Sequence, residues 1–529
     1  MSIAPLSQLR LVAARTPEGV AIIEESGRRA TFRELVARVE RIERGLSAQG
    51  MRRGDRVLFA IRPSEVAIAS MLAITELGAV IVAAQIGVGD ELFAAQMRAV
   101  RPSWVVAESA LVAAMGSKVV HRIVKMRGGA LPSLDALLDA LLGARFVASG
   151  PWLPGLRGAV RLEELERDTQ RAANERVVME PEPTVPPNIT SAAFIVFTSG
   201  TTAAPKAVIH SRGSLEATLE VVSGLLAIAP GDRLLARELH LLLPALLAGA
   251  TVYVPRGQRY DLHRTARALV EHRITHMYEV TANLVRLVEY FERSRSSLPT
   301  SLRHVMVGAA PVRQAFFRRL RNVLSANARA WCVYGMTEIL PIAAIEIEEK
   351  LAYDQDGDIV GRPVDGVRVE ISIDGELIVY GPHLFTGYLG GPTVSSLATG
   401  DLAIIDDGRI VLIGRAKDMI IRGNYNIYPE LYEPTIERVA GVRRCAMVGV
   451  YSEATADECI VLAVEAEPGV NAEGLVRRLR QEMRDGPARI DNAAQPDFIF
   501  VMALPESGRS HKVDKRALRE TARKRLECA

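Results

Sequence analysis

Lysine is scarce in this 529-residue chain, which has 8 lysines among its 65 basic residues. A lysine inside a motif is therefore informative, because arginine takes its place almost everywhere else. An excess of one charge is missing too, since 65 Lys and Arg face 62 Asp and Glu, for a formal net charge of +3. This balance excludes a nucleic-acid-binding protein that depends on a broad positive field.

Cysteine is also sparse, and its spacing excludes a disulfide framework and a CxxC-type zinc site. The four cysteines are Cys332, Cys445, Cys459 and Cys528. We expect no signal peptide, because residues 1–10 lack a basic segment followed by an apolar one. The longest apolar stretch, 66–88, is interrupted by Glu76 and Gln85, and it predicts a buried helix and strand in place of a membrane span. These features favour a reducing, cytoplasmic location.

Strand and helix patterns alternate along most of the chain. Thr31 and Glu34 have the spacing of a capping box, ahead of apolar residues at helical spacing. Strands are predicted at 56–61, 79–84, 192–197, 251–254, 304–307 and 330–333, and helices from Ser64 and at 214–228, 262–272 and 312–324. This alternation indicates the α/β fold class with parallel sheets. From about Val360, short strands with glycine turns at 367–373, 376–379, 402–405 and 409–413 predict a small β-rich unit.

A hydroxyl-rich loop follows the predicted strand 192–197. Residues 198–202 read Thr-Ser-Gly-Thr-Thr, and Lys206 comes shortly after them. Such a loop can present N–H and O–H donors and a cation to a polyphosphate, although the GxxxxGK[ST] spacing of a Walker A loop is absent. A plain surface turn is the alternative. The scarcity of lysine and the preceding strand favour the phosphate site.

Together with the rest of the chain, this loop resembles the phosphate-binding motif of the adenylate-forming superfamily, which includes acyl-CoA synthetases, luciferases and adenylation domains of peptide synthetases. Five further segments resemble later motifs of that family in the expected order: Gly308–Pro311, Tyr334–Glu338 (YGxTE), Thr399–Leu402, Gly414–Asp418 and Lys512–Arg516. Six matches in register make the resemblance specific. It implies an enzyme that joins ATP and a carboxylic acid into an acyl-adenylate with release of pyrophosphate.

The resemblance also implies a role for each matching residue. The nucleotide-binding set is Thr198, Ser199, Gly200, Thr201, Thr202 and Lys206 at the β- and γ-phosphates, Gly308, Ala309, Ala310 and Pro311 near the adenine, Tyr334 against the adenine ring with Gly335 beside it, and Asp401 and Arg415 at the ribose. The catalytic set is Thr337 at the α-phosphate, Glu338 as ligand of Mg²⁺, which prefers oxygen donors, and Lys512, which reaches the acid carboxylate and the α-phosphate.

The domain organisation follows from the same resemblance. We expect a large N-terminal AMP-binding (adenylation) domain at 1–416, made of parallel α/β subdomains and the β-rich subdomain, and a small mobile α+β domain at 417–529 that carries Lys512. Lys417 is the expected hinge, and 423–429 is the loop that would swing into the site. Lys515 and Lys524 are expected to be solvated residues of a basic helix.

Three departures from the family pattern bear on function. Ala203 and Ala207 replace expected glycines, and each would cost on the order of 1 kcal/mol if its φ were positive. The segment 232–249, which borders the acyl pocket in the family, looks shortened, with His240 out of register. His511 precedes Lys512 where glycine is usual. The last two features resemble β-lactone synthetases of olefin biosynthesis.

Three hypotheses therefore stand. The favoured one is an AMP-forming acid–thiol ligase that transfers the acyl group to CoA. The second passes acyl-AMP to an acyl-carrier protein or closes a β-hydroxy fatty acid to a β-lactone, and the third is a degenerate nucleotide-binding member. We expect a fatty acid as substrate, because no charged residue stands out at 306–308 or 278–281, and we expect no nucleic-acid partner.

Residues 111–165 combine basic positions with leucines. An ordinary packed amphipathic helix is the favoured interpretation, and a peripheral membrane contact is the alternative.

Overall fold

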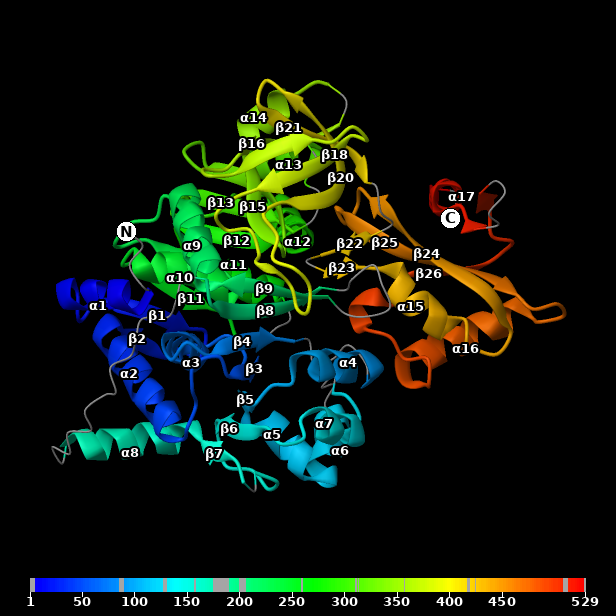
Figure 1. Cartoon of the computed structure of the whole chain (residues 1–529). Helices are drawn as coiled ribbons and strands as arrows, with labels where there is room; N and C mark the ends of the chain where they lie inside the picture. The colour runs from blue at the N-terminus through cyan, green and yellow to red at the C-terminus, as the bar shows by residue number, and fades with distance from the viewer. Residues whose placement is uncertain are drawn as a thin grey trace.

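The computed structural model describes residues 5–84, 90–126, 131–156, 158–174, 190–198, 206–257, 260–309, 312, 314–355, 357–415, 419–423, 425–507 and 512–527. Within these ranges the side chains at 125, 171–174, 198, 239–240, 414–415, 426, 430–431, 506–507 and 512 are not described. Figure 1 shows a large body that contains both main sheets, with the C-terminal elements to one side of it.

The larger sheet has 13 strands. In spatial order they are β17 (Arg368–Ile371), β18 (Glu376–Tyr380), β20 (Leu397–Asp406), β21 (Arg409–Arg415), β16 (Asp358–Pro363), β15 (Ile339–Glu346), β14 (Arg329–Met336), β13 (His304–Gly308), β12 (His276–Val280), β10 (Arg233–Leu235), β11 (Thr251–Val254), β1 (Val20–Glu24) and β2 (Arg29–Thr31). The strands β14, β13, β12, β10, β11 and β1 form one parallel run, which confirms the predicted α/β class. The strands on either side of this run, β15 and β2, are antiparallel to it.

The second sheet has eight strands. They are β19 (Gly387–Tyr388), β9 (Lys206–Ser211), β8 (Ala192–Thr198), β4 (Val80–Ala83), β3 (Arg56–Ala60), β5 (Trp104–Glu108), β6 (Arg145–Ser149) and β7 (Val160–Arg161). The strands from β8 to β7 in this order are parallel, whereas β9 and β19 form an antiparallel edge.

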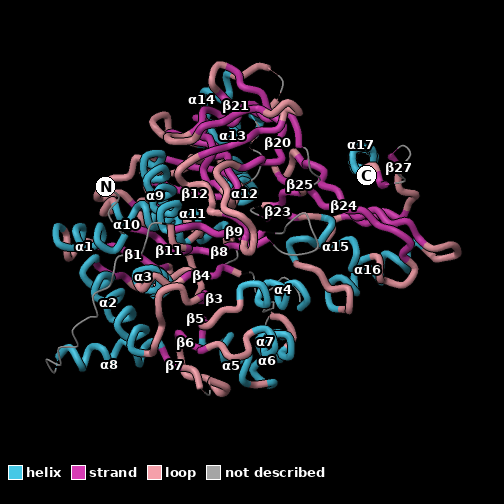
Figure 2. Tube along the Cα trace, in the orientation of Figure 1, coloured by secondary structure: helices cyan, strands magenta, loops and turns pink. Residues whose placement is uncertain are grey.

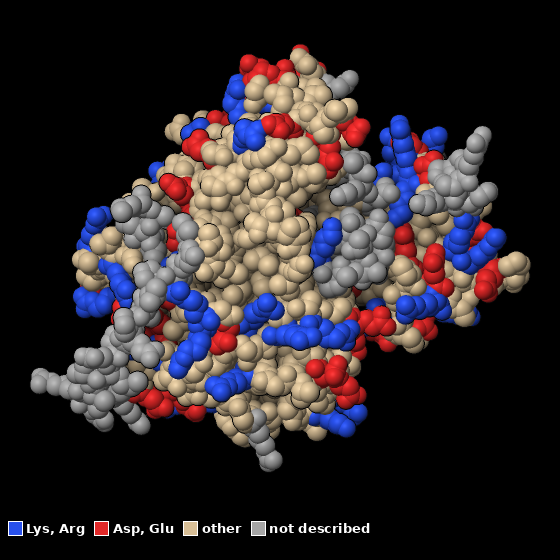
Figure 3. Space-filling view, viewed as in Figure 1, with Lys and Arg blue, Asp and Glu red and all other residues tan. Residues whose placement is uncertain are grey.

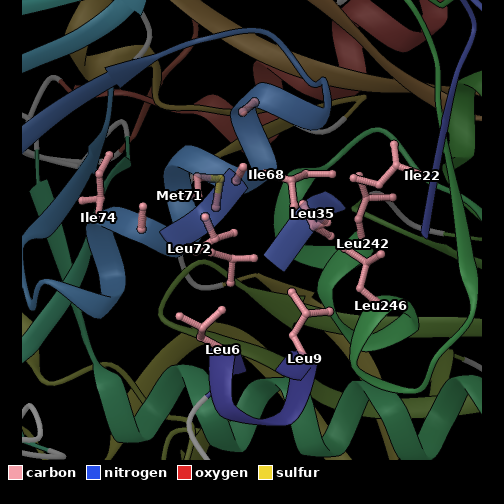
Figure 4. Close-up of a cluster of buried hydrophobic side chains, with 14 of the residues drawn as sticks. Leu6, Leu9, Ile22, Leu35, Ile68, Met71, Leu72, Ile74, Leu242 and Leu246 are labelled. Atoms are coloured by element: carbon pink, nitrogen blue, oxygen red, sulfur yellow. The ribbon is translucent and has the colours of Figure 1, made fainter. Parts of the chain in front are cut away.

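Helices separate and cover the two sheets (Figure 2). The middle layer contains α1 (Pro5–Arg15), α2 (Phe32–Ala48), α3 (Glu65–Glu76), α9 (Arg212–Leu226) and α10 (Leu239–Leu247). Their apolar side chains share one core with both sheets, part of which Figure 4 shows. Because side chains alternate along a strand, Ile22 faces this middle core while Ile23 faces the opposite layer.

The outer layers complete the large body. On the larger sheet lie α11 (Leu262–Glu271), α12 (Thr281–Arg293), α13 (Gln314–Val323) and α14 (Ile347–Ala352). On the smaller sheet lie α4 (Asp90–Val100), α5 (Ser109–Gly116), α6 (Lys118–Met126) and α7 (Leu134–Ala140). The remaining helix, α8 (Leu162–Asn174), packs on α2 where Gly45 allows close approach, since a Cβ there would stand 2.9 Å from the Cβ of Leu165.

The predicted capping box is present at the start of α2. The backbone N–H of Glu34 donates to Thr31 Oγ1 at 3.2 Å, and that of Thr31 donates to Glu34 Oε2 at 2.8 Å. Such a cap contributes about 1 kcal/mol, and it sets the register that buries the apolar face of the helix.

The β-rich segment is continuous with the larger sheet and is not a sheet of its own. β16 pairs with β15 on one side and with β21 on the other. A register shift between Ile359 and Gly361, where Gly361 has a φ of 94°, marks the junction. The segment nevertheless has its own small core, which includes Val379, Leu384 and Ile410.

The C-terminal part has a three-stranded sheet of β24 (Val442–Ser452), β25 (Asp457–Ala466) and β26 (Phe498–Val501). The sheet is covered by α15 (Pro429–Ile436) and α16 (Ala472–Asp485) on one face and by α17 (Lys515–Glu527) on the other. Two small hairpins complete it: β22 (Ile420–Arg422) with β23 (Tyr425–Ile427), and β27 (Glu506–Ser507) with β28 (Lys512–Val513). The predicted boundary at 416/417 falls on residues outside the described ones.

Candidate active site

Thr337 and Glu338 occupy the turn of a tight hairpin. Met336 at the end of β14 pairs with Ile339 at the start of β15, so these two residues form the connection. Glu338 is 9% exposed, and Tyr388 Oη donates to its Oε1 at 2.8 Å. Its backbone carbonyl accepts from the N–H of Phe385 at 2.7 Å. The hairpin tip is therefore held from both its side chain and its backbone.

Lys206 lies close to the same group. It opens β9, where it pairs with Thr198 at the end of β8, and β9 in turn pairs with Tyr388 of β19. The Lys206 Nζ stands 5.1 Å from the centre of the Tyr388 ring. A cation, a phenol and a carboxylate thus follow one another at the point where the two sheets meet. Burial and the neighbouring Glu338 raise the pKa of Tyr388, so its hydroxyl remains a donor at neutral pH.

The loop between these strands carries most of the predicted phosphate contacts. Ser199, Gly200, Thr201 and Thr202 lie outside the described residues, and the Thr198 side chain is not described. The antiparallel pairing of Thr198 with Lys206 shows that β8 and β9 are paired up to the two residues that flank the loop.

Tyr334 and Asp401 are in direct contact. The phenol of Tyr334 donates to Asp401 Oδ2 at 2.6 Å, and Asp401 is 6% exposed. Arg415, whose side chain is not described, pairs with Asp401 across the β20–β21 ladder. The structure therefore places the expected adenine and ribose residues side by side. Gly335 lies within the same strand and is closely packed, because a Cβ there would stand 2.7 Å from Leu340 Cδ1.

Two buried histidines, which the sequence did not single out, hold the backbone around the hairpin tip. His210 Nε2 lies 2.7 Å from the carbonyl oxygen of Thr337, and His383 Nε2 lies 2.6 Å from that of Pro341. Burial lowers the pKa of both rings, which therefore act as neutral N–H donors. Tyr388 was missed as well. Its only local signal is a glycine-rich turn, which does not indicate a site.

The predicted adenine-proximal loop begins at the end of β13. Gly308 is close to the next strand, since a Cβ there would stand 2.9 Å from the carbonyl oxygen of Val333 and 3.6 Å from Tyr278 Oη. Ala309 follows with a φ of 68° and is exposed. Ala310 and Pro311 lie outside the described residues.

The expectation that 278–281 contains no notable charge is wrong. Glu279 in that segment is 2% exposed and forms an ion pair with Arg237 at 3.3 Å. Asn283 Nδ2 also donates to it at 2.8 Å. Nothing in the local sequence of β12 (His276–Val280) marks Glu279 as a buried charge. The arginine that compensates the charge follows β10, which pairs with β12 in the sheet although the two residues are 42 positions apart in sequence.

A second carboxyl lies nearby at Glu238. Burial, and next the charge of Glu279, raise the pKa of Glu238 to about 7. The same two carboxylates raise the pKa of Tyr278, after the larger effect of burial. The carboxyl ends of β10 and β12 therefore hold polar groups beside Gly308, at the edge where open α/β sheets bind ligands.

Two of the departures can be compared with the structure. Ala207 lies in β9, is 4% exposed and does not have a positive φ, so its replacement of glycine carries no backbone strain. Ala203 and His511 lie outside the described residues. The shortened segment 232–249 forms β10 and α10, and the His240 side chain is not described.

The described backbone of Lys512 and the side chains of Lys515 and Lys524 belong to the C-terminal part, away from this cluster. Lys417 is outside the described residues, and Lys512 is described only as backbone in β28. Figure 2 shows β27, the partner of β28, far from β8 and β9. Lys515 was expected to be solvated, but its side chain is 12% exposed and Nζ lies 2.8 Å from Glu433 Oε1. Lys524 is exposed, as expected.

Glu338 would supply only one of the ligands that a magnesium ion needs. No group of three or more His, Cys, Asp or Glu side chains that could hold a metal is found among the described residues. Mg²⁺ is commonly bound by one or two carboxylates, with phosphate oxygens and waters completing the shell. A single carboxylate beside the Lys206 hairpin matches that donor set. No helix within the described residues is long and apolar enough to cross a membrane.

The chain is similar in sequence to known AMP-binding enzymes. The model of a family described as AMP-binding enzyme matches residues 9–389. The chain is 28% identical over 466 residues to a feruloyl-CoA synthase from Amycolatopsis sp, with 83% of this chain and 84% of the relative covered. It is 26% identical over 524 residues to an olefin beta-lactone synthetase from Xanthomonas campestris pv. campestris, with 88% and 87% covered.

The fold agrees as well. The amide bond synthetase McbA from Marinactinospora thermotolerans is similar, with a TM-score of 0.77 and 24% identity over 97% of this chain and 99% of that one. Because the family model spans well over half of the chain and the fold matches from end to end, the chain belongs to the AMP-binding enzymes of the adenylate-forming superfamily.

Proposed function

We propose that this enzyme activates a fatty acid with ATP and then transfers the acyl group to CoA. A carboxylate oxygen attacks the α-phosphorus, the bond from that phosphorus to the bridging oxygen breaks, and pyrophosphate leaves. The thiolate sulfur of CoA then attacks the acyl carbon and AMP leaves. The observation that carries the proposal is the pairing of Tyr334 with Asp401 beside the cluster of Lys206, Tyr388 and Glu338.

Each part of ATP has a matching group in this arrangement. Tyr334 would stack on the adenine, and Asp401 would accept hydrogen bonds from the ribose hydroxyls. Lys206 and the loop at 198–202 would bind the β- and γ-phosphates, and Thr337 the α-phosphate. Bound at Glu338, Mg²⁺ would supply positive charge to the phosphate oxygens. Such fixed charges stabilise the charge that develops during phosphoryl chemistry.

The two-domain organisation belongs to the same proposal. The body at 1–416 would bind ATP and the acid, and the part at 417–529 would turn about Lys417 to bring Lys512 to the carboxylate. The distance between β27 and the β8–β9 hairpin in Figure 2 makes such a movement necessary for that lysine to act. Hinge residues of this kind absorb large changes in φ and ψ.

The test is incubation of the purified protein with Mg-ATP, CoA and a panel of fatty, 3-hydroxy and aryl acids, with mass spectrometry of the products. ATP–pyrophosphate exchange measures the first step alone. We expect acyl-CoA as the product from fatty acids. In the variant Lys512→Ala, the rate of ATP–pyrophosphate exchange should fall at least 100-fold. Lys524→Ala is the matched control in the same terminal region. Exchange without any CoA-dependent product would reject the ligase, and no exchange with any acid would indicate a degenerate nucleotide-binding protein.

A second candidate, closure of a β-hydroxy fatty acid to a β-lactone without CoA, is supported by similarity to relatives of that name and by one feature of the structure. One relative named as an olefin beta-lactone synthetase aligns over 88% of this chain. The feature is the polar edge beside Gly308, where Glu238 and Tyr278 could receive a substrate hydroxyl. The panel separates the candidates, because a lactone forms only from 3-hydroxy acids and does not need CoA. Transfer to an acyl-carrier protein is tested by adding a carrier in place of CoA.

A further inference from the structure

An unusually apolar surface lies on the outer layer of the smaller sheet, where α6, α7 and the β6–β7 loop meet. Six large apolar side chains are exposed within a stretch of 34 residues, and we call them the α6–α7 surface: Val119 (69% exposed), Ile123 (44%), Met126 (80%), Leu138 (51%), Leu142 (87%) and Trp152 (66%). Single exposed apolar residues are ordinary, whereas a concentration of them marks an interaction site.

Ordinary amphipathic packing does not explain why these apolar side chains are exposed. On α6, Val120 and Val124 pack towards the core, while Val119, Ile123 and Met126, at helical spacing, point the other way. Leu137 and Leu141 of the α7 region are likewise buried at 0% and 4%, whereas Leu138 and Leu142 beside them are exposed. Both segments therefore have apolar residues on a buried side and on an exposed side. No described residue of the protein covers the exposed side.

These segments lie together in the fold. α6 and α7 both pack against α5, at the lower edge of the molecule in Figure 1. The loop with Trp152 packs on the α5–α6 junction, because a Cβ on Gly116 would stand 2.0 Å from the carbonyl oxygen of Gly155. β6 is separated from the Lys206 strand by β5, β3, β4 and β8, so the surface is remote from the candidate active site.

The segment that carries the surface has an excess of basic residues. Residues 117–156 contain five basic residues, Lys118, Arg122, Lys125, Arg127 and Arg145, and two acidic ones, Asp135 and Asp139. Lys118 and Arg122 are exposed, and neither forms an ion pair with another described residue. On the face that Figure 3 shows, positive and negative side chains are interspersed.

We propose that the α6–α7 surface docks the enzyme on an anionic lipid bilayer. Exposed apolar and aromatic side chains enter the interface between headgroups and acyl chains, and basic residues beside them pair with anionic lipid. A tryptophan has the apolar body and polar N–H that suit this interface. A second copy of the chain is disfavoured as occupant, because self-association would bring the same positive charges together.

The experiment uses the full chain and vesicles of phosphatidylcholine alone or with 30 mol% phosphatidylglycerol, a composition of roughly the anionic content that polybasic segments recognise. Co-sedimentation measures the partition coefficient. We expect binding to the anionic vesicles at least about tenfold stronger than to the neutral ones, weakening with salt. In the triple variant Met126→Ser, Leu142→Ser, Trp152→Ser, the partition coefficient for the anionic vesicles should fall by about tenfold or more. In the double variant Lys118→Gln with Arg122→Gln, the same partition coefficient should fall roughly fivefold for each charge removed.

The matched control is Val270→Ser with Ile373→Ser, which removes two exposed apolar residues from other surfaces, 59% and 106% exposed. It should bind vesicles as the unaltered chain does. ATP–pyrophosphate exchange should be unchanged in the triple variant, which also reports that it is folded. Equal binding by the triple variant, or no binding to anionic vesicles, would overturn the proposal. So would light scattering that shows an oligomer which the triple variant abolishes, or binding of an acidic carrier protein in place of vesicles.

Discussion

The phenol of Tyr334 donates a 2.6 Å hydrogen bond to Asp401, although the two residues lie on strands four places apart in the larger sheet. In a flat sheet four steps span about 19 Å, which is far beyond the reach of one tyrosine side chain. The β-rich end of the sheet therefore curls back over the β14–β15 hairpin. This curl brings the residues expected at the adenine and at the ribose into one place.

Removal of the Tyr334 hydroxyl should weaken ATP binding modestly. Tyr334→Phe keeps the ring but leaves Asp401 Oδ2 without this donor, a loss of about 1 kcal/mol, or roughly fivefold in the KM for ATP. Asp401→Ala should raise that KM by roughly 100-fold, because two ribose hydrogen bonds to a charged acceptor are lost. Steady-state kinetics with varied ATP measure both. Tyr380→Phe, which removes a hydroxyl bonded to the exposed Glu370, is the control; an equal effect there would contradict the role of Tyr334.

The contact between Tyr388 and Glu338 should control the dependence on magnesium. Tyr388→Phe removes the 2.8 Å hydrogen bond that fixes the carboxylate, so the Mg²⁺ concentration for half-maximal exchange should rise by roughly three- to tenfold. Glu338→Gln should lower the exchange rate by roughly 100-fold or more, since the charge that holds the ion is lost. Titration of Mg²⁺ at saturating ATP gives both values. An unchanged Mg²⁺ midpoint in both variants would exclude Glu338 as the ligand.

Acid should destabilise the large domain through His276. Burial, followed by the neighbouring His304, lowers the pKa of His276 from 6.5 to about 4. Its ring is 1% exposed, stacks on His304 at 4.6 Å and faces Asp232 at 4.0 Å. Below pH 6.5 the unfolded chain binds a proton that the folded chain refuses, so the free energy of unfolding falls as the pH falls from 6.5 towards 4. The loss is on the order of 2–3 kcal/mol.

Denaturant unfolding between pH 7.5 and pH 4.5 measures this effect. His276→Asn should flatten the dependence, whereas His263→Asn, on the exposed side of α11, should leave it unchanged. A slope that is the same in the His276 variant would show that other buried groups dominate.

Restoring the glycine at 207 should not improve ATP binding. Ala207 is extended, buried in β9 and bonded through its carbonyl to the N–H of Leu389 at 2.9 Å. Ala207→Gly should therefore lower the free energy of unfolding by about 0.5–1 kcal/mol and leave the KM for ATP within roughly twofold, since no strain is relieved. Thermal denaturation and ATP kinetics test it. A clearly lower KM in this variant would mean that the loop requires a backbone angle which Ala207 does not show.

The sequence by itself determined the fold class, most of the strands and the family. Apolar periodicity is a local property, so the capping box at Thr31 and the strand 251–254 agree with the structure almost residue by residue. The order of the motifs along the chain was enough to expect ATP chemistry at Tyr334, Glu338 and Asp401. Those inferences needed only residue types and spacing.

The tertiary structure alone decided how groups distant in sequence compensate one another. Glu279 did not stand out in the sequence, and only the fold shows that it is buried beside Arg237. Tyr388 acquired a role only because β19 joins the edge of the second sheet next to Glu338. Scarcity of lysine had pointed to function, yet buried Lys350 serves the fold, with Nζ 2.6 Å from Asp358. A buried charge needs a partner from anywhere in the fold, and local sequence carries no record of which residue that partner is.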